Sequence, residues 1–310
     1  MKTTARRRIR LALLATSLVV VVGLIASWIV GSALVAPSPC IVGNPPPELN
    51  GTAFTVASKS GSLISGWHVH PNASKGVVVL LHGIKGSRLS MLDRARMLHR
   101  AGYASVMIDL QAHGESPGTA ITVGHVEQHD VQAAVNYARS QYPDLPIGVI
   151  GVSLGGASAL LASPLDVDAL VLESVYPTIR DAIRNRVSAR LGIFSPLPTF
   201  LLLVQLDYRL GISPSELRPI DRIADMDCPV YVVSGRLDQH TTEKETRKLF
   251  SKARHPKTLW LVDGASHVDL MRHNPDEYRQ RILGFMDTHL GAGVDGEGSA
   301  SLALPNAILR

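Results

Sequence analysis

The residues with the clearest chemical potential lie in the segment GVSLG at 151–155, which has the pattern Gly-x-Ser-x-Gly. The apolar run IGVI precedes it and a run of small residues follows, so Ser153 is predicted at a sharp turn from a strand into a helix. Such a turn strains the backbone, tolerates only small neighbours, exposes the serine Oγ and leaves the next N–H free at the helix N-terminus. Ser153 is therefore predicted to be a nucleophile. The alternative is a tight turn in which the serine only caps the helix.

A serine nucleophile needs a base, and in folds that carry this turn the chain order is nucleophile, acid, base. His267 lies in the segment VDGASH, in a Gly-containing loop between a predicted strand and the last predicted helix, and we predict it to be the base. The other downstream histidines fall in predicted helices or beside a proline: His255, His273 and His289. His240 stays open, because it sits in the loop of the predicted acid and could line the pocket.

The predicted acid is Asp238 in the segment SGRLD, which follows the second strand after the nucleophile strand. A carboxylate there can accept a hydrogen bond from the imidazole Nδ1–H, which fixes the tautomer and stabilises the imidazolium. Glu173, just past the preceding strand, and Asp263, four residues before His267, are the alternatives.

Acyl transfer also requires donors for a developing oxyanion. The segment HGIKG at 82–86 follows the apolar run VVVLL, where a second donor loop belongs, so we predict that the N–H groups of Ile84 and Leu154 form the oxyanion hole. His82 and Gly83 are expected to support this loop.

The elements that must position these residues alternate short β-branched runs with helical patterns. This alternation predicts an α/β fold, with a mostly parallel central sheet of about eight strands and helices on both faces. The predicted strands are 53–57, 63–70, 76–81, 104–109, 147–152, 167–172, 230–234 and 257–262, and the predicted helices are 89–101, 125–141, 154–162, 242–253 and 275–290. The segment 176–221 is too long for an ordinary connection and contains FLLLVQL, so it is predicted to be an inserted helical cap.

The N-terminal part of the chain predicts a membrane anchor. Residues 1–10 form a basic tail, and residues 11–36 are an uncharged apolar segment long enough to span a bilayer as a single transmembrane helix. The positive-inside rule keeps the tail in the cytoplasm and places the catalytic domain outside the cytoplasmic membrane. A cleaved signal, which would release a secreted protein, and a buried core helix are the alternatives.

The rest of the chain is organised around one large domain. Residues 37–50 are Pro-rich and predicted to be a stiff, extended linker, residues 51–290 form the folded domain, and residues 291–310 are predicted to be a loose tail.

Composition excludes several classes of function. The net charge of +5 comes from the first ten residues, so no basic face for nucleic acid remains. The two cysteines, Cys40 and Cys228, are too few for a disulfide scaffold, and whether they pair stays open. His125 and His129 have helical metal-ligand spacing but no evident third ligand, and no GxGxxG motif for a dinucleotide is present. No metal and no cofactor is predicted.

Taken in order, the segments HGIKGS, DLQAHGES, GVSLGG, SGRLD and GASH resemble those of the α/β-hydrolase superfamily, over about residues 51–290. Within it, the chain most resembles the membrane-anchored or secreted serine hydrolases of the Bem46-like and serine aminopeptidase-like groups. The resemblance implies a triad of Ser153, Asp238 and His267, no cofactor, and hydrolysis of an ester, thioester or amide through an acyl-enzyme. The segment DLQAHGES departs from the commoner D-x-R-G-x-G-x-S pattern at Gln111 and Ala112, in a loop that we expect to be structural.

The sequence therefore predicts a membrane-anchored serine hydrolase that cleaves a carboxylic ester or thioester with a small or lipid-derived acyl group. One alternative is a peptidase or amidase on the same triad, which would want acidic residues beside the pocket; the cap supplies few beyond Asp207 and Glu216. Another is an inactive membrane-tethered scaffold for interactions. The apolar patch at 200–206 favours a lipid-derived substrate or simply packs the cap onto the sheet, and the oligomeric state is left open.

Overall fold

The structure is a computed structural model that describes residues 2–291, so the predicted C-terminal tail lies almost entirely outside the described residues. Its helices are α1 (Lys2–Val35), α2 (Leu92–Arg100), α3 (Glu127–Gln141), α4 (Leu154–Leu161), α5 (Ile179–Leu191), α6 (Pro196–Leu210), α7 (Glu243–Lys252), α8 (Leu270–His273) and α9 (Pro275–Leu290). Short 3-10 turns lie at Pro47–Leu49, Arg88–Met91, Gly192–Phe194, Pro219–Asp221 and Ile223–Asp225.

The eight predicted strands form one sheet, which confirms the predicted fold class. They are β2 (Gly51–Ala57), β3 (Leu63–Val69), β4 (Val77–Leu81), β5 (Ala104–Ile108), β7 (Ile147–Val152), β8 (Ala169–Glu173), β9 (Val230–Gly235) and β10 (Lys257–Val262). The sheet order is β10-β9-β8-β7-β4-β5-β3-β2, and every neighbouring pair is parallel except the two that involve β3. The carboxyl ends of β7, β9 and β10 therefore meet at one edge, which is where such sheets carry their sites.

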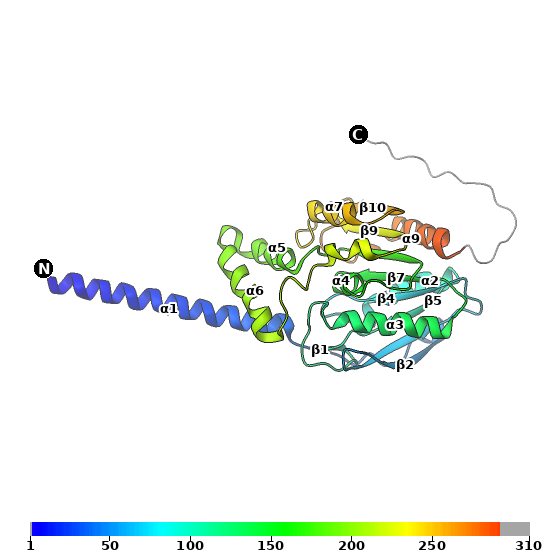
Figure 1. Cartoon of the computed structure of the whole chain (residues 1–310), viewed down its shortest axis with the longest axis horizontal. Helices are drawn as coiled ribbons and strands as arrows, with labels where there is room; N and C mark the ends of the chain where they lie inside the picture. The colour runs from blue at the N-terminus through cyan, green and yellow to red at the C-terminus, as the bar shows by residue number, and fades with distance from the viewer. Residues whose placement is uncertain (1, 292–310) are drawn as a thin grey trace, which may run out of the picture.

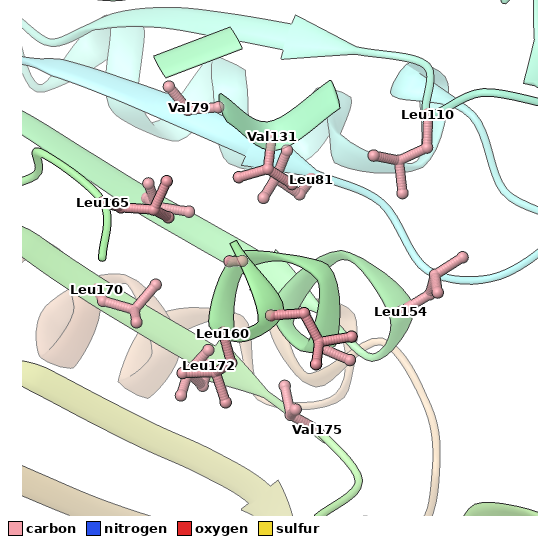
Figure 2. Close-up of a cluster of buried hydrophobic side chains, with 14 of the residues drawn as sticks. Val79, Leu81, Leu110, Val131, Leu154, Leu160, Leu165, Leu170, Leu172 and Val175 are labelled. Carbon is pink, nitrogen blue, oxygen red and sulfur yellow. The ribbon is translucent and has the colours of Figure 1, made fainter. Parts of the chain in front are cut away.

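Two apolar cores hold the helices against this sheet. Along β4, Val77, Val79 and Leu81 belong to the core under α3 and α4, whereas Val78 and Leu80 belong to the core under α2 and α9. The strand is buried on both faces because side chains alternate across a strand, which explains its uninterrupted apolar run. Figure 2 shows part of the first core, where Leu160 of α4 lies beside Leu172 of β8.

The segment between β8 and β9 forms the predicted helical cap. Its helices α5 and α6 make a hairpin at the end of the domain from which α1 emerges (Figure 1). Helix α1 projects away from the domain, and its stretch Arg7–Val35 is long and apolar enough to cross a membrane.

The Pro-rich segment after α1, predicted to be a stiff, extended linker, is also hydrogen-bonded to the domain. Residues Ser38–Pro39 form a short strand, β1, that pairs in parallel with β6 (His113–Gly114). Further along, the backbone N–H groups of Val42 and Gly43 both donate to one carboxylate oxygen of Glu115, at 3.0 and 2.9 Å. The segment is bound to the domain because residues 112–115 offer acceptors for its few N–H groups, so α1 leaves the domain in a defined direction.

Candidate active site

Ser153 sits in the strained turn that its motif predicted. Its backbone has φ 49° and ψ −106°, a conformation that costs a non-glycine residue on the order of 1–3 kcal/mol. The flanking glycines allow the turn, because a Cβ on Gly151 would lie 2.5 Å from the Cα of Gly156, and one on Gly155 would lie 2.5 Å from the carbonyl oxygen of Leu81. The side chain of Ser153 is thereby held at the carboxyl edge of the sheet.

The two predicted oxyanion donors flank this serine. Leu154 is the first residue of α4, so its N–H has no acceptor one turn back in the helix. The loop that contains Ile84 approaches from β4, and a Cβ on Gly83 would lie 3.7 Å from the Ser153 Cβ. Both predicted donors therefore belong to backbone segments that lie next to Ser153.

His82 joins the loop at 82–86, which holds the predicted donor Ile84, to the neighbouring loop at Leu110 from within the core. Its Nε2 accepts the N–H of Leu110 at 3.1 Å, which leaves Nδ1–H to donate to the carbonyl oxygen of Gly83 at 2.7 Å. The ring is completely buried. This geometry suits the supporting role that the sequence suggested and uses both ring nitrogens of a neutral imidazole.

The burial of His82 leads to a pH-dependent stability. Burial, with the nearby His113 and Arg88, lowers its pKa to about 3, whereas the unfolded residue titrates near about 6.5. Between these values the unfolded chain binds one proton more, so His82 lowers the free energy of unfolding by about 1.4 kcal/mol per unit as pH falls below about 6.5. In urea unfolding at pH 7, 6 and 5, wild type should lose about 2 kcal/mol more than His82→Gln between pH 7 and pH 5. Parallel curves for the two proteins would contradict the assignment.

Asp238 and His267 come together at the ends of β9 and β10. The imidazole Nδ1 lies 2.7 Å from Oδ2 of Asp238, whose other partners are the N–H groups of His240 and Thr241 and the Thr241 hydroxyl. Burial opposes ionisation of the carboxyl, but the hydrogen bond and charge of His267 and the Thr241 donors outweigh it and hold the pKa of Asp238 below its usual value. The carboxylate is thus kept ionised and fixed toward the imidazole, and Nε2 remains for a further partner.

The structure does not join all three predicted residues by hydrogen bonds. Within residues 2–291, Ser153 Oγ makes no hydrogen bond to His267. The strands that lead to the two residues, β7 and β10, lie at the same sheet edge with β8 and β9 between them. The structure therefore brings Asp238 and His267 into contact and places Ser153 at the same edge of the sheet, without a hydrogen bond to the imidazole among the described residues.

The alternatives for the acid and base have other partners. Glu173 is buried and paired with Arg94 at 2.6 Å, with Tyr278 as a further donor. Asp263 is exposed and pairs with Arg236 at 2.6 Å. His240, left open by the sequence, lies beside His267 with ring centroids 4.9 Å apart. His240 is thus a neighbour of the imidazole, and neither alternative carboxylate is bonded to it.

Two cationic side chains near the site were not identified as site residues from the sequence. Lys85, in the oxyanion loop, has a left-handed φ of 58° and donates to the carbonyl oxygen of Ala33 in the last turn of α1 at 2.6 Å. Arg186 of α5 is half-buried, and the pKa of its guanidinium is lowered by burial although the fields of Tyr176 and Asp238 oppose this. Arg186 could not be linked to the site from the sequence, because only the folding of the α5–α6 hairpin brings it near Asp238.

The loop at 109–116, where the sequence departs from the commoner D-x-R-G-x-G-x-S pattern, makes its turn without a glycine at position 112. Ala112 has a φ of 59°, in the region that favours glycine. Gln111 donates from Nε2 to Glu127 at 2.7 Å and to the carbonyl oxygen of Ala120, and its N–H donates to Asp130. These contacts are internal to the domain, as expected for a structural loop.

The remaining sequence candidates do not form a further site. No group of three or more His, Cys, Asp or Glu side chains able to hold a metal occurs in the part of the chain that the structure describes. The Nδ1 atom of His125 lies 3.9 Å from Oε1 of Glu216. Both Cys40 and Cys228 are free thiols, the first exposed and the second buried.

The sheet order, the strained serine after β7 and the carboxylate–imidazole pair after β9 and β10 define an α/β-hydrolase, and comparisons with known proteins agree. The serine aminopeptidase S33 family model matches residues 72–197. The uncharacterised Mycobacterium tuberculosis protein Rv2307c is 30% identical over 224 residues, which cover 71% of this chain and 73% of that protein. The uncharacterised Bacillus subtilis protein YqkD is 24% identical, with 77% of this chain and 80% of that protein covered.

Solved structures share the fold. The Pyrococcus furiosus esterase Pf2001 superposes with a TM-score of 0.69 at 24% identity, over 83% of this chain and 99% of the esterase. The chain therefore belongs to the α/β-hydrolase superfamily.

Proposed function

We propose that this chain is a membrane-anchored serine hydrolase that cleaves a carboxylic ester or thioester through an acyl-enzyme. The observation that carries the proposal is the hydrogen bond of 2.7 Å between buried Asp238 and His267, at the same sheet edge as the strained Ser153. A buried carboxylate oriented toward an imidazole is the arrangement that a serine nucleophile needs for general-base activation.

In the proposed reaction, Ser153 Oγ attacks the carbonyl carbon while His267 Nε2 takes its proton. Asp238 holds the Nδ1–H tautomer and stabilises the imidazolium, and the N–H groups of Ile84 and Leu154 bind the oxyanion. His267 then gives the proton to the leaving alkoxide or thiolate. Water, activated by the same imidazole, hydrolyses the acyl-enzyme and releases the acid.

An ester or thioester is favoured over a peptide because of the charges near the site. The acidic residues of the cap that could bind a free amino terminus, Asp207 and Glu216, are exposed, and Glu216 is occupied by the N–H of Ser213. The cap residue whose charge acts on Asp238 is instead the cationic Arg186. The family match to serine aminopeptidases keeps a peptidase or amidase as the second candidate.

The anchor is part of the proposal, with the basic N-terminal tail in the cytoplasm and the catalytic domain outside. Contacts of the last turn of α1 with the domain support an uncleaved helix. They include the bond from Lys85 to Ala33 and the bond from the Ile121 N–H to the carbonyl oxygen of Val35, at 2.6 and 2.8 Å. Cleavage after residue 36 would remove both acceptors.

A fluorophosphonate probe tests the proposal, because it phosphonylates only an activated serine. The wild-type chain in detergent should label stoichiometrically, and Ser153→Ala should not label. Ser174→Ala is a matched control: Ser174 also follows a strand and has a positive φ of 50°, but it precedes no helix, so its loss should leave labelling intact. Unchanged labelling of Ser153→Ala would remove the mechanism.

Substrate class is decided by turnover of p-nitrophenyl esters of increasing chain length beside aminoacyl p-nitroanilides. We expect esters to be hydrolysed with the higher kcat/KM. Faster cleavage of the anilides would favour the peptidase.

A further inference from the structure

Helix α6 of the cap is apolar on two opposite faces. One face packs onto the domain through the buried residues Leu202, Leu203 and Leu206. The other exposes Leu197, Phe200, Val204 and Tyr208, whose spacing of three or four residues places them on one side of the helix. A helix with two apolar faces requires an apolar environment on both sides, and the domain supplies only one.

The exposed face continues around the tip of the α5–α6 hairpin. Leu191, Ile193 and Phe194 lie there, and Ile193 and Phe194 are 87% and 76% exposed. Together with the four residues of α6, these side chains form a surface that we name the apolar cap stripe. Contiguous exposed apolar side chains of this kind mark interaction surfaces in soluble domains.

Helix α6, which carries most of the apolar cap stripe, is fixed to the last turns of α1. Gln205 Nε2 donates to Ser27 Oγ at 2.8 Å, and Arg209 donates to Ser32 Oγ at 2.9 Å while its guanidinium stacks 3.6 Å from the Trp28 ring. The two helices approach closely at Gly31, where a Cβ would lie 2.3 Å from Gln205 Oε1. The position of α6 relative to the anchor is therefore set by specific contacts.

The length of α1 places these contacts at the surface of a bilayer. At about 1.5 Å per residue the apolar segment 11–36 is ~39 Å long, whereas the hydrocarbon core is about 30 Å thick. The stretch from Ser27 to Ser32, within the last three turns of α1, therefore lies near the membrane–water interface, and Trp28 is a residue type enriched there. Helix α6 must lie at the same depth, because it is bonded to those turns.

The charge of the cap suits the same surface. Between residues 179 and 210 there are five basic and two acidic side chains: Arg180, Arg184, Arg186, Arg190 and Arg209 against Asp181 and Asp207. Three of these cations, Arg180, Arg184 and Arg190, are exposed, and exposed cations beside an apolar face are attracted to anionic lipid headgroups.

We propose that the apolar cap stripe inserts into the outer leaflet of the bilayer that α1 spans, so that the cap lies in the headgroup and upper acyl-chain region. This inference rests on the anchored topology of the proposed function. It has a consequence for substrate entry: Asn185 of α5 donates to the carbonyl oxygen of His240, the neighbour of His267. The same short hairpin thus contacts lipid at its tip and the site along its first helix, which favours acyl substrates drawn from the membrane.

The experiment uses the full chain in nanodiscs of phosphatidylcholine and phosphatidylglycerol at 3:1, with an environment-sensitive NBD label on single cysteines. Cys40→Ser serves as the background. Cys228 can stay, because it is buried and burial raises the pKa of its thiol to about 12. Labels at Phe200→Cys and Tyr208→Cys should be blue-shifted and quenched at least twofold by lipids that carry a doxyl group on the acyl chain.

Two further labels make the result decisive. Gln141→Cys, exposed at the end of α3 beside the amino end of β7, should stay unquenched, and Val20→Cys in the middle of α1 should be quenched if the anchor spans the bilayer. Quenching at Val20→Cys without quenching at Phe200→Cys and Tyr208→Cys would overturn the proposed insertion of the apolar cap stripe but would still support the membrane anchor. A blue shift at Phe200→Cys without quenching, in discs holding two chains, would show that a second copy covers the stripe and would overturn it too. Fluorophosphonate labelling of the same samples reports the catalytic proposal separately.

Discussion

Ser153→Ala and His267→Ala should each lower kcat for p-nitrophenyl butyrate by roughly 10⁴- to 10⁶-fold, and the double variant should be no worse than either single variant. The reason is that nucleophile and base act as one unit: without the imidazole the hydroxyl keeps its proton, and without the hydroxyl the imidazole has no proton to take. Residual activity would come from the oxyanion donors and substrate binding alone.

The comparison with the control variant Ser174→Ala separates chemistry from folding, because both serines adopt a positive φ in loops that follow adjacent strands. Single variants whose losses multiply in the double variant would mean that Ser153 and His267 act independently. That outcome would remove the proposed triad even if each loss were large. The test is needed because the structure joins His267 to Asp238 but not to Ser153.

The fold and much of the candidate site were predictable because they depend on local patterns. The run VVVLL is apolar throughout because β4 is covered on both faces. The pattern Gly-x-Ser-x-Gly requires its glycines because Cβ atoms at Gly151 and Gly155 would collide with the backbone. The pairing of Asp238 with His267 followed from chain order and from the fact that parallel strands end at one edge. The catalytic role of Ser153 stays a prediction until the activity measurements are made.

Other features could not be read from the sequence because they depend on distant segments. The linker at 37–50 looks like a spacer by composition, yet the acceptor that binds it, Glu115, is more than seventy residues away. Of the two explanations for the patch at 200–206, packing of the cap accounts for the buried Leu202, Leu203 and Leu206. Phe200 and Val204 are exposed, and a role in binding a lipid-derived substrate stays a prediction. The sequence pattern of a helix shows how much apolar surface it carries but not which parts of the molecule cover that surface.

The buried ion pair beneath the site is a further long-range feature with a large expected effect. Arg94 of α2 pairs with Glu173 at the end of β8, with a second carboxylate, Asp269, at 3.1 Å. Tyr278 of α9 donates to the same Glu173, and burial raises the pKa of its hydroxyl well above the usual value. Glu173 also accepts the N–H of Ser153 through its carbonyl oxygen at 2.8 Å, so the network lies directly behind the nucleophile turn.

Arg94→Met should lower the free energy of unfolding by about 3–5 kcal/mol, because it leaves the carboxylate of Glu173 buried without its counter-charge. Arg96→Met is the matched control on the same helix: Arg96 pairs with exposed Glu48 at 2.8 Å, and such surface pairs contribute at most about 1 kcal/mol. Urea unfolding in detergent, followed by circular dichroism, gives both values. The double variant Arg94→Met/Glu173→Gln should recover part of the loss, since the stranded charge is gone. An Arg94→Met protein as stable as the Arg96→Met control would mean that water reaches Glu173 and that the pair is not a buried one.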